Sequence, residues 1–220
     1  MISLALLFGD LLLLNYVYNV RQCYPFLNDF QIIVGHNNKF IGRKALVVDM
    51  LQTPHLLVCG LSGNGKSKMV EYCLKDKQCV ILNAFQEDYS TLDCPKIPFV
   101  DDIVIYLQGL LTNPVKLDTP LYVAIDELLI LNYNKTASEL VKQLLLIGRH
   151  YNIFVIGITQ VAQKENLKFK DLFNSRITFR QIEESNYRCV LGYSPVDTNL
   201  KKQEFFLYTN NSYKGKTYNI

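Results

Sequence analysis

Apolar residues occur along this chain mainly in short uninterrupted runs, separated by longer stretches with an apolar residue at every third or fourth position. Uninterrupted apolar runs are typical of strands that are buried on both faces of a parallel sheet. The longer spacing predicts amphipathic helices. The pattern therefore predicts strands at residues 30–35, 43–50, 55–60, 78–84, 120–127, 152–160, 176–180, 204–210 and 216–220, and helices at residues 66–76, 100–111, 136–151 and 183–192.

Strands and helices alternate through most of the chain, which predicts an α/β fold with a largely parallel central sheet flanked by helices. Residues 85–99 show no clear period and predict a loop. The length of 220 residues and the hydrophobic fraction of 49% fit one sizeable core. We therefore expect one main domain at residues 23–220, preceded by an apolar segment at residues 1–22.

The apolar segment at residues 1–22 is rich in leucine and close to the length that crosses a membrane. Asp10 lies in its middle, where a carboxylate costs about 2.5–3.5 kcal/mol on insertion scales. No basic residue precedes the run and no small-residue cleavage site follows it, so a secretory signal is not expected. Two interpretations stay open, a helix that packs on the core or on a neighbouring subunit and a membrane anchor at residues 2–18.

The composition adds two weaker indications. The six cysteines form no CxxC pair and no cluster with histidine at zinc-binding spacing, so metal binding by cysteine is not expected. Free cysteines without a pairing pattern are typical of a reducing, intracellular setting. Residues 164–220 contain ten Lys and Arg residues against six Asp and Glu residues, whereas the whole chain has a net charge of +3. This basic excess fits a solvated face and a surface for an anionic polymer equally well.

The strongest chemical signal is the stretch GLSGNGKS, which matches the phosphate-binding pattern G-x-x-x-x-G-K-[ST] between a predicted strand and a predicted helix. Glycines allow successive backbone N–H groups to point at a phosphate, and the start of the following helix favours its negative charge. Lys66 is expected to reach the β- and γ-phosphate oxygens, and the Ser67 hydroxyl to bind Mg²⁺. The candidate ATP-binding residues are Gly60, Leu61, Ser62, Gly63, Asn64, Gly65, Lys66, Ser67 and Lys68.

An acidic pair, Asp126 and Glu127, ends the predicted strand at residues 120–127. At the carboxyl end of a buried strand beside the phosphate loop, we expect Asp126 to hold the Mg²⁺ shell and Glu127 to polarise the attacking water. The alternative is an acidic cap of a following helix, which the phosphate loop makes less favourable. Thr159 and Gln160 end a later strand as a neutral polar pair suited to contact the γ-phosphate or the water.

Arg149 lies near the end of a predicted helix, just before that later strand. Such a residue can favour the helix dipole from an exposed position, or it can reach a neighbouring subunit's nucleotide as an arginine finger. Three basic residues follow Gln160 and are candidate DNA contacts, although surface charges that serve solubility explain them equally well: Lys164, Lys168 and Lys170.

These motifs and their order resemble the motor domain of the FtsK/HerA superfamily of DNA-translocating ATPases, and the FtsK-like branch in particular. The resemblance covers residues 32–192 and includes PHLLV before the phosphate loop, the acidic pair, Arg149 and NIFVIGITQ. It implies a RecA-like P-loop NTPase fold, ATP and Mg²⁺ as cofactors, and a hexameric ring around double-stranded DNA. It also implies that Arg149 is an arginine finger in trans and Gln160 a polar sensor. Val161 and Ala162 stand where that branch usually has Arg-Pro.

The resemblance implies a minimal motor of a plasmid, a conjugative element or a virus, because the chain has no room for the membrane spans and DNA-orienting domain of chromosome translocases. Expected partners are double-stranded DNA, further copies of the chain, and a relaxase, transfer or capsid protein. The expected location is the cytoplasm, with membrane contact through residues 2–18, or the virion or host cell for a virus. The alternative functions are a nucleotide-dependent assembly scaffold or coupling protein with little turnover, and a viral genome-packaging ATPase.

Overall fold

The structure, a computed structural model, describes residues Leu13, Leu14, Val17, 25–38, 43–163, 167 and 169–218. Its strands are β1 (Gln31–Asn38), β2 (Arg43–Asp49), β3 (Leu56–Cys59), β4 (Cys79–Leu82), β5 (Lys96–Ile97), β6 (Leu121–Ile125), β7 (Ile153–Thr159), β8 (Ser175–Thr178), β9 (Glu204–Tyr208) and β10 (Ser212–Lys216). Its α-helices are α2 (Lys66–Leu74), α3 (Val100–Leu111), α4 (Leu128–Tyr133), α5 (Lys135–Ile147) and α6 (Glu184–Leu191). The short 3-10 helices are η1 (Gly148–Tyr151) and η2 (Lys170–Leu172).

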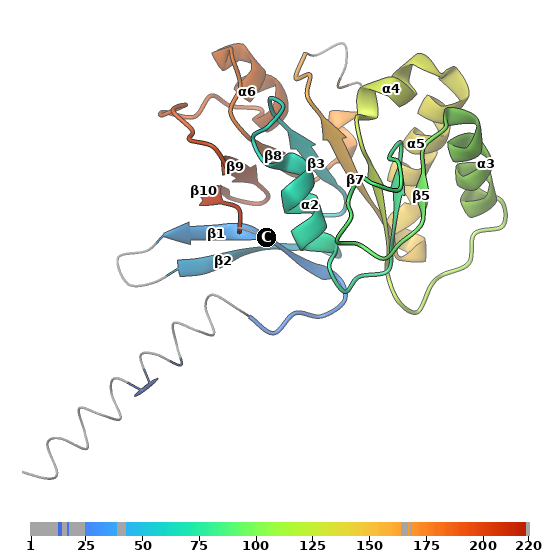
Figure 1. Ribbon diagram of the computed structural model, residues 1–220, viewed down its shortest axis with the longest axis horizontal. Helices are drawn as coiled ribbons and strands as arrows, with labels where there is room; N and C mark the ends of the chain where they lie inside the picture. The colour runs from blue at the N-terminus through green and yellow to red at the C-terminus, as the bar shows by residue number, and fades with distance from the viewer. Residues whose placement is uncertain are drawn as a thin grey trace, which may run out of the picture.

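Within the described residues, all ten strands join one sheet in the order β2-β1-β10-β9-β8-β3-β7-β6-β4-β5 (Figure 1). The part from β8 to β5 is parallel, and the remaining neighbours pair antiparallel. The expected fold, a P-loop NTPase with a mainly parallel central sheet flanked by helices, is therefore confirmed. β10 lies between β1 and β9, so strands from the two ends of the chain are neighbours in the sheet.

Alternating residues of the parallel strands face two separate layers of the core. In β3, Leu56 and Val58 pack into the cluster that contains the apolar side of α2 and the β1–β2 hairpin. Leu57 and Cys59 pack into the cluster that contains α3, α5 and α6. Because both faces are covered, all four residues of β3 are fully buried, which explains the uninterrupted apolar run in the sequence.

Three elements differ from the prediction. The last strand is Ser212–Lys216 rather than residues 216–220, because a tight turn fixes the register in which Ser212 pairs with Tyr208. The predicted loop at residues 85–99 contains the short strand β5, which pairs with β4. Helix α4 follows the acidic pair directly and was not predicted.

The predicted apolar segment at residues 1–22 lies almost wholly outside the described residues. Only Leu13, Leu14 and Val17 are described there, and their side chains are exposed. Among the described residues, no helix has both the length and the apolar character that a membrane crossing requires.

Candidate nucleotide site

The phosphate loop leaves β3 and enters α2 through backbone conformations that favour glycine. Gly60 and Gly65 have φ values of 148° and 104°. A Cβ atom added at Gly60 would lie 2.6 Å from the Cβ of Phe179, so a larger residue does not fit there. Gly65 is the N-cap of α2 and places no side-chain hydrogen bond on the first turn, which leaves the N–H groups at the helix start facing the site.

Lys66 is held against its own loop. Its Nζ atom donates hydrogen bonds to the carbonyl oxygens of Gly60, at 2.7 Å, and Leu61, at 3.1 Å. The side chain is 8% exposed, and this burial lowers its pKa, while the nearby Cys59, Glu127 and Asp126 act in the opposite direction. A phosphate bound at this loop would compete with these two carbonyls for the ammonium group.

The acidic pair follows β6 at the carboxyl edge of the sheet, next to β4 and β7. Asp126 is half-buried, and this burial raises the pKa of its carboxyl group, although Tyr89 and Lys66 counteract the shift. Glu127 has a φ of 58°, a left-handed conformation that is unusual for a glutamate and is typical of functional sites.

Thr159 holds the Glu127 carboxylate. At the end of β7, its Oγ1 atom donates a hydrogen bond to Oε1 of Glu127 at 3.0 Å, and Thr159 itself is 1% exposed. The same hydroxyl accepts a hydrogen bond from the backbone N–H of Val161 at 3.3 Å. The carboxylate is therefore oriented by the end of a neighbouring strand.

A cavity of about 420 Å³ opens between the phosphate loop and these strand ends. Nine predicted site residues line it, which are Ser62, Gly63, Gly65, Lys66, Ser67, Lys68, Asp126, Glu127 and Gln160. Gly60, Leu61 and Asn64 support the loop from behind: Gly60 and Leu61 accept from Lys66, and the Asn64 side chain donates to the Leu61 and Ser62 carbonyls. The structure thus brings the phosphate-loop residues, the acidic pair and the polar strand end to one cavity.

Two further residues line this cavity that the sequence analysis missed, Lys202 and Gln203. Gln203 adopts a φ of 70°, and its backbone N–H donates to the Asn64 carbonyl of the phosphate loop at 3.2 Å. Its carbonyl accepts from Thr217, so this turn connects the phosphate loop to the C-terminal strands. The only hint in the sequence is the basic excess of the last quarter, which does not single out Lys202.

The residues present fit a magnesium ion. Ser67 and Asp126 offer a hydroxyl and a carboxylate oxygen at the edge of the cavity. Mg²⁺ in nucleotide sites is usually held by one or two such oxygen ligands together with phosphates and water. With a nucleotide bound, these two residues would hold the ion, which would neutralise charge on the phosphates.

Arg149 lies at the opposite edge of the sheet from this cavity. It is exposed on η1, directly before β7 begins, whereas Thr159 and Gln160 stand at the end of that strand. A strand of seven residues spans about 20 Å. Near Arg149 lies the buried His55, whose pKa is lowered by burial and further by this guanidinium. Arg149 is thus not brought together with the other predicted catalytic residues of its own chain.

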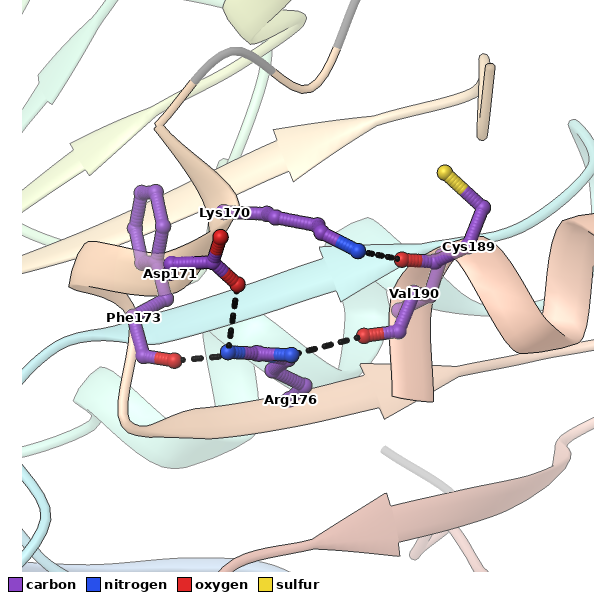
Figure 2. A network of polar contacts seen from close by, with 6 residues as sticks. All are labelled: Lys170, Asp171, Phe173, Arg176, Cys189 and Val190. Atoms are coloured by element: carbon purple, nitrogen blue, oxygen red, sulfur yellow. Dashed lines mark hydrogen bonds and ion pairs between the residues drawn. The ribbon is translucent and has the colours of Figure 1, made fainter. Parts of the chain in front are cut away.

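Of the three candidate DNA contacts, Lys164 and Lys168 lie outside the described residues. Lys170 is described and is engaged within the fold (Figure 2). Its Nζ atom donates to the Cys189 carbonyl at 2.8 Å, and Arg176 beside it donates to the Val190 carbonyl at 3.4 Å. Both carbonyls belong to the last turn of α6, where positive groups are favourable, so these contacts fasten α6 to η2 and β8.

One cavity, lined by the phosphate loop, the acidic pair and the polar end of β7, is the nucleotide site of a P-loop ATPase fold. No protein-family model and no curated protein matches the chain. Solved structures share its fold. The pCW3 conjugation coupling protein TcpA has a TM-score of 0.71 at 17% identity, over 88% of this chain and 67% of that one. The cytoplasmic domain of the Thermomonospora curvata type VII secretion ATPase EccC has a TM-score of 0.67 at 17% identity, over 90% of this chain and 30% of that one.

The genome-packaging NTPase B204 of Sulfolobus turreted icosahedral virus 2 is also similar, with a TM-score of 0.56 at 14% identity, over 76% of this chain and 99% of that one. The resemblance to FtsK/HerA-like ATPases is confirmed at the level of the fold. The chain spans 67% of the conjugation protein and 30% of the secretion ATPase.

Proposed function

We propose that the chain is an ATP-hydrolysing motor that moves double-stranded DNA for a mobile genetic element or a virus. The observation that carries this proposal is the cavity at which the phosphate loop, Asp126, Glu127 and Gln160 meet. The likeness in fold to a conjugation coupling protein and a genome-packaging NTPase supports the choice of DNA as cargo. Both of those structures contain an ATP analogue, which supports ATP as the nucleotide.

In this proposal the site divides the work of hydrolysis among its residues. Lys66 leaves its two loop carbonyls and neutralises charge on the β- and γ-phosphates. Glu127 accepts a proton from the attacking water, whose oxygen bonds to the γ-phosphorus as the bond to the bridging β–γ oxygen breaks. Gln160, which lines the same cavity, orients that water or contacts the γ-phosphate. The products are ADP and inorganic phosphate.

Arg149 is proposed to act in the site of a neighbouring copy. Its exposed position at the edge opposite its own cavity supports this role, because it would have to cross the length of β7 to reach its own nucleotide. An arginine that reaches a neighbour's γ-phosphate makes hydrolysis depend on assembly. A closed ring of copies, for which we propose six, supplies such a neighbour to every subunit.

DNA contacts are proposed for the loop between β7 and η2, which carries Lys164 and Lys168. Gln160 lines the nucleotide cavity and directly precedes this segment. Loss of a contact between Gln160 and the γ-phosphate would therefore shift the start of the segment that carries the lysines. Lysines that meet phosphates grip DNA without reading its bases, and their binding falls steeply as salt increases. Lys170 has a smaller part in this proposal because its ammonium group binds the Cys189 carbonyl.

The test is ATP hydrolysis by the full chain with and without duplex DNA. We expect duplex DNA to stimulate hydrolysis, and Glu127→Gln to abolish turnover while ATP binding persists. Stimulation should decline steeply as salt rises. Hydrolysis that is indifferent to DNA would refute the DNA motor, and hydrolysis unchanged in Glu127→Gln would refute the assigned base. ATP binding without turnover in the unaltered chain would instead favour the assembly scaffold.

A second candidate function is a motor that moves protein. The likeness to EccC, a type VII secretion ATPase, covers 90% of this chain and favours this candidate. Another structure with the same fold contains EccC ATPases with a signal sequence peptide, and its TM-score is 0.66 at 12% identity, over 87% of this chain and 41% of that one. Stimulation of hydrolysis by a peptide and not by duplex DNA would support this candidate over the first.

A further inference from the structure

Tyr89 lies in the segment that connects β4 to β5, which the sequence predicted only as a loop. The segment starts beside the acidic pair, because Leu82 of β4 pairs with Ile125 of β6 and the Asn83 side chain donates to the backbone carbonyl of Asp126. It then turns toward α2, where the N–H of Thr91 donates to Oε1 of Glu71 at 3.4 Å. The segment thus spans from the strand that carries Asp126 to the helix that carries Ser67.

The segment is fastened at several points around Tyr89. The backbone N–H of Phe85 donates to Oδ2 of Asp88 at 2.9 Å, and the N–H of Leu92 donates to the Tyr89 carbonyl at 3.0 Å. Tyr89 itself has a φ of 51°, the left-handed conformation that bulky residues rarely adopt. Its side chain is only 5% exposed. The loop therefore keeps the tyrosine in one place, at some cost in backbone strain.

The hydroxyl group of Tyr89 has no hydrogen-bond partner among the described residues, although it is buried. It lies beside the side chains of Ser67 and Asp126, which both act on it, and a phenol hydroxyl can donate one hydrogen bond. A buried hydroxyl without a partner is costly and uncommon in folded proteins. A donor poised beside Asp126 and Ser67 therefore calls for a partner in another state of the site.

We propose that Tyr89 is a positioning residue on the metal side of the nucleotide site, and that its hydroxyl donates a hydrogen bond to the Asp126 carboxylate once nucleotide and Mg²⁺ are bound. The bond fixes the carboxylate in the orientation in which it meets the ion's ligand shell. This proposal rests on the proposed function, since it assumes that Asp126 and Ser67 hold Mg²⁺.

The test compares Tyr89→Phe with a matched control, Tyr106→Phe. Tyr106 is a half-buried tyrosine of α3 that packs in the core cluster of one layer, whereas Tyr89 packs in the cluster of the other layer, which contains α2. Binding of ATPγS to the full chain is measured with Mg²⁺ and with EDTA, and the melting temperature is measured without nucleotide. No DNA and no turnover are needed, so this test is separate from the test of the DNA motor.

We expect Tyr89→Phe to reduce the gain in ATPγS affinity that Mg²⁺ provides by about tenfold, the size expected for one hydrogen bond to a charged group. Binding in EDTA should change less than about twofold. The melting temperature of the nucleotide-free variant should stay the same or rise, because the unpartnered hydroxyl is removed. Tyr106→Phe should leave the Mg²⁺-dependent gain unchanged.

Three results would overturn the positioning role. They are an unchanged Mg²⁺-dependent gain, an equal loss of affinity with and without Mg²⁺, and a melting temperature that falls well below that of Tyr106→Phe. A purely structural role for the hydroxyl would lower the melting temperature and the affinity in both buffers. Failure of the unaltered chain to bind ATPγS at all would refute the proposed nucleotide site itself.

Discussion

Replacement of Thr159 by valine removes the hydroxyl that orients Glu127 and keeps the shape of the side chain. The lost contact is a 3.0 Å hydrogen bond to a carboxylate. Such bonds contribute about 1.5–3 kcal/mol when buried, and the half-buried Glu127 can recover part of this from water. We therefore expect the barrier to hydrolysis to rise by about 1–2 kcal/mol, which lowers kcat about 5- to 30-fold.

The same substitution should also destabilise the fold slightly, because the N–H of Val161 loses its contact with the Thr159 hydroxyl. A loss of about 1 kcal/mol lowers the melting temperature of a chain of this size by roughly 2–4 °C. ATP affinity should change little, since the affected group acts on the water rather than on the bound nucleotide. The assay is steady-state ATP hydrolysis together with equilibrium binding of ATPγS.

Thr178→Val is a matched control for this prediction. Thr178 and Thr159 pair with the same residue, Cys59, from the two neighbouring strands of β3, and both are buried. The Thr178 hydroxyl donates to the Phe179 carbonyl and accepts from Gln181, so it stabilises the fold without contacting Glu127. Equal decreases of kcat in the two variants would refute the idea that Thr159 acts through the carboxylate.

Three further predictions concern other parts of the molecule. Lys202→Ala should weaken ATPγS binding, whereas Lys201→Ala, next to it but outside the cavity lining, should not; equal effects would contradict a direct contact. Arg149→Ala should abolish hydrolysis and retain ATP binding, and mixing it with Lys66→Ala should restore part of the activity; no rescue in demonstrably mixed assemblies would count against a shared site. Burial lowers the pKa of His55 to about 4, below its ordinary value of 6.5. The imidazole is therefore protonated at a lower pH in the native state than in the unfolded state. The free energy of unfolding should therefore fall by roughly 3 kcal/mol between pH 6.5 and 4, and denaturant titration should find this part missing in His55→Gln.

The nucleotide site can be predicted from the sequence largely because its residues follow directly after buried strands. The continuous apolar runs identify the strands, and the carboxyl ends of parallel strands meet at one edge. β6 is followed directly by Asp126 and Glu127, and β7 ends at Thr159 and is followed by Gln160. That these residues lie near Lys66 therefore follows from the fold class.

Lys202, Gln203 and Tyr89 could not be predicted in the same way. The first two reach the cavity because β9 and β10 add antiparallel strands beside β8, and this pairing depends on contacts between distant parts of the chain. Gln203 also adopts a positive φ, which the sequence does not indicate because the residue is not a glycine. The position of Tyr89 depends on the path of a loop, which is fixed by hydrogen bonds to the Asp88 and Glu71 side chains. Such single contacts leave no periodic pattern in the sequence.

The position of β10 between β1 and β9 has a consequence for synthesis on the ribosome. β1 is translated before all the other described strands, but its neighbour on one side consists of Ser212–Lys216, which are translated after all of them. Until then the β1–β2 hairpin has an open edge, which can pair with other chains. A nascent chain stalled before Ser212 should therefore be more prone to aggregate than a chain that contains β10, and should need a chaperone to stay in solution.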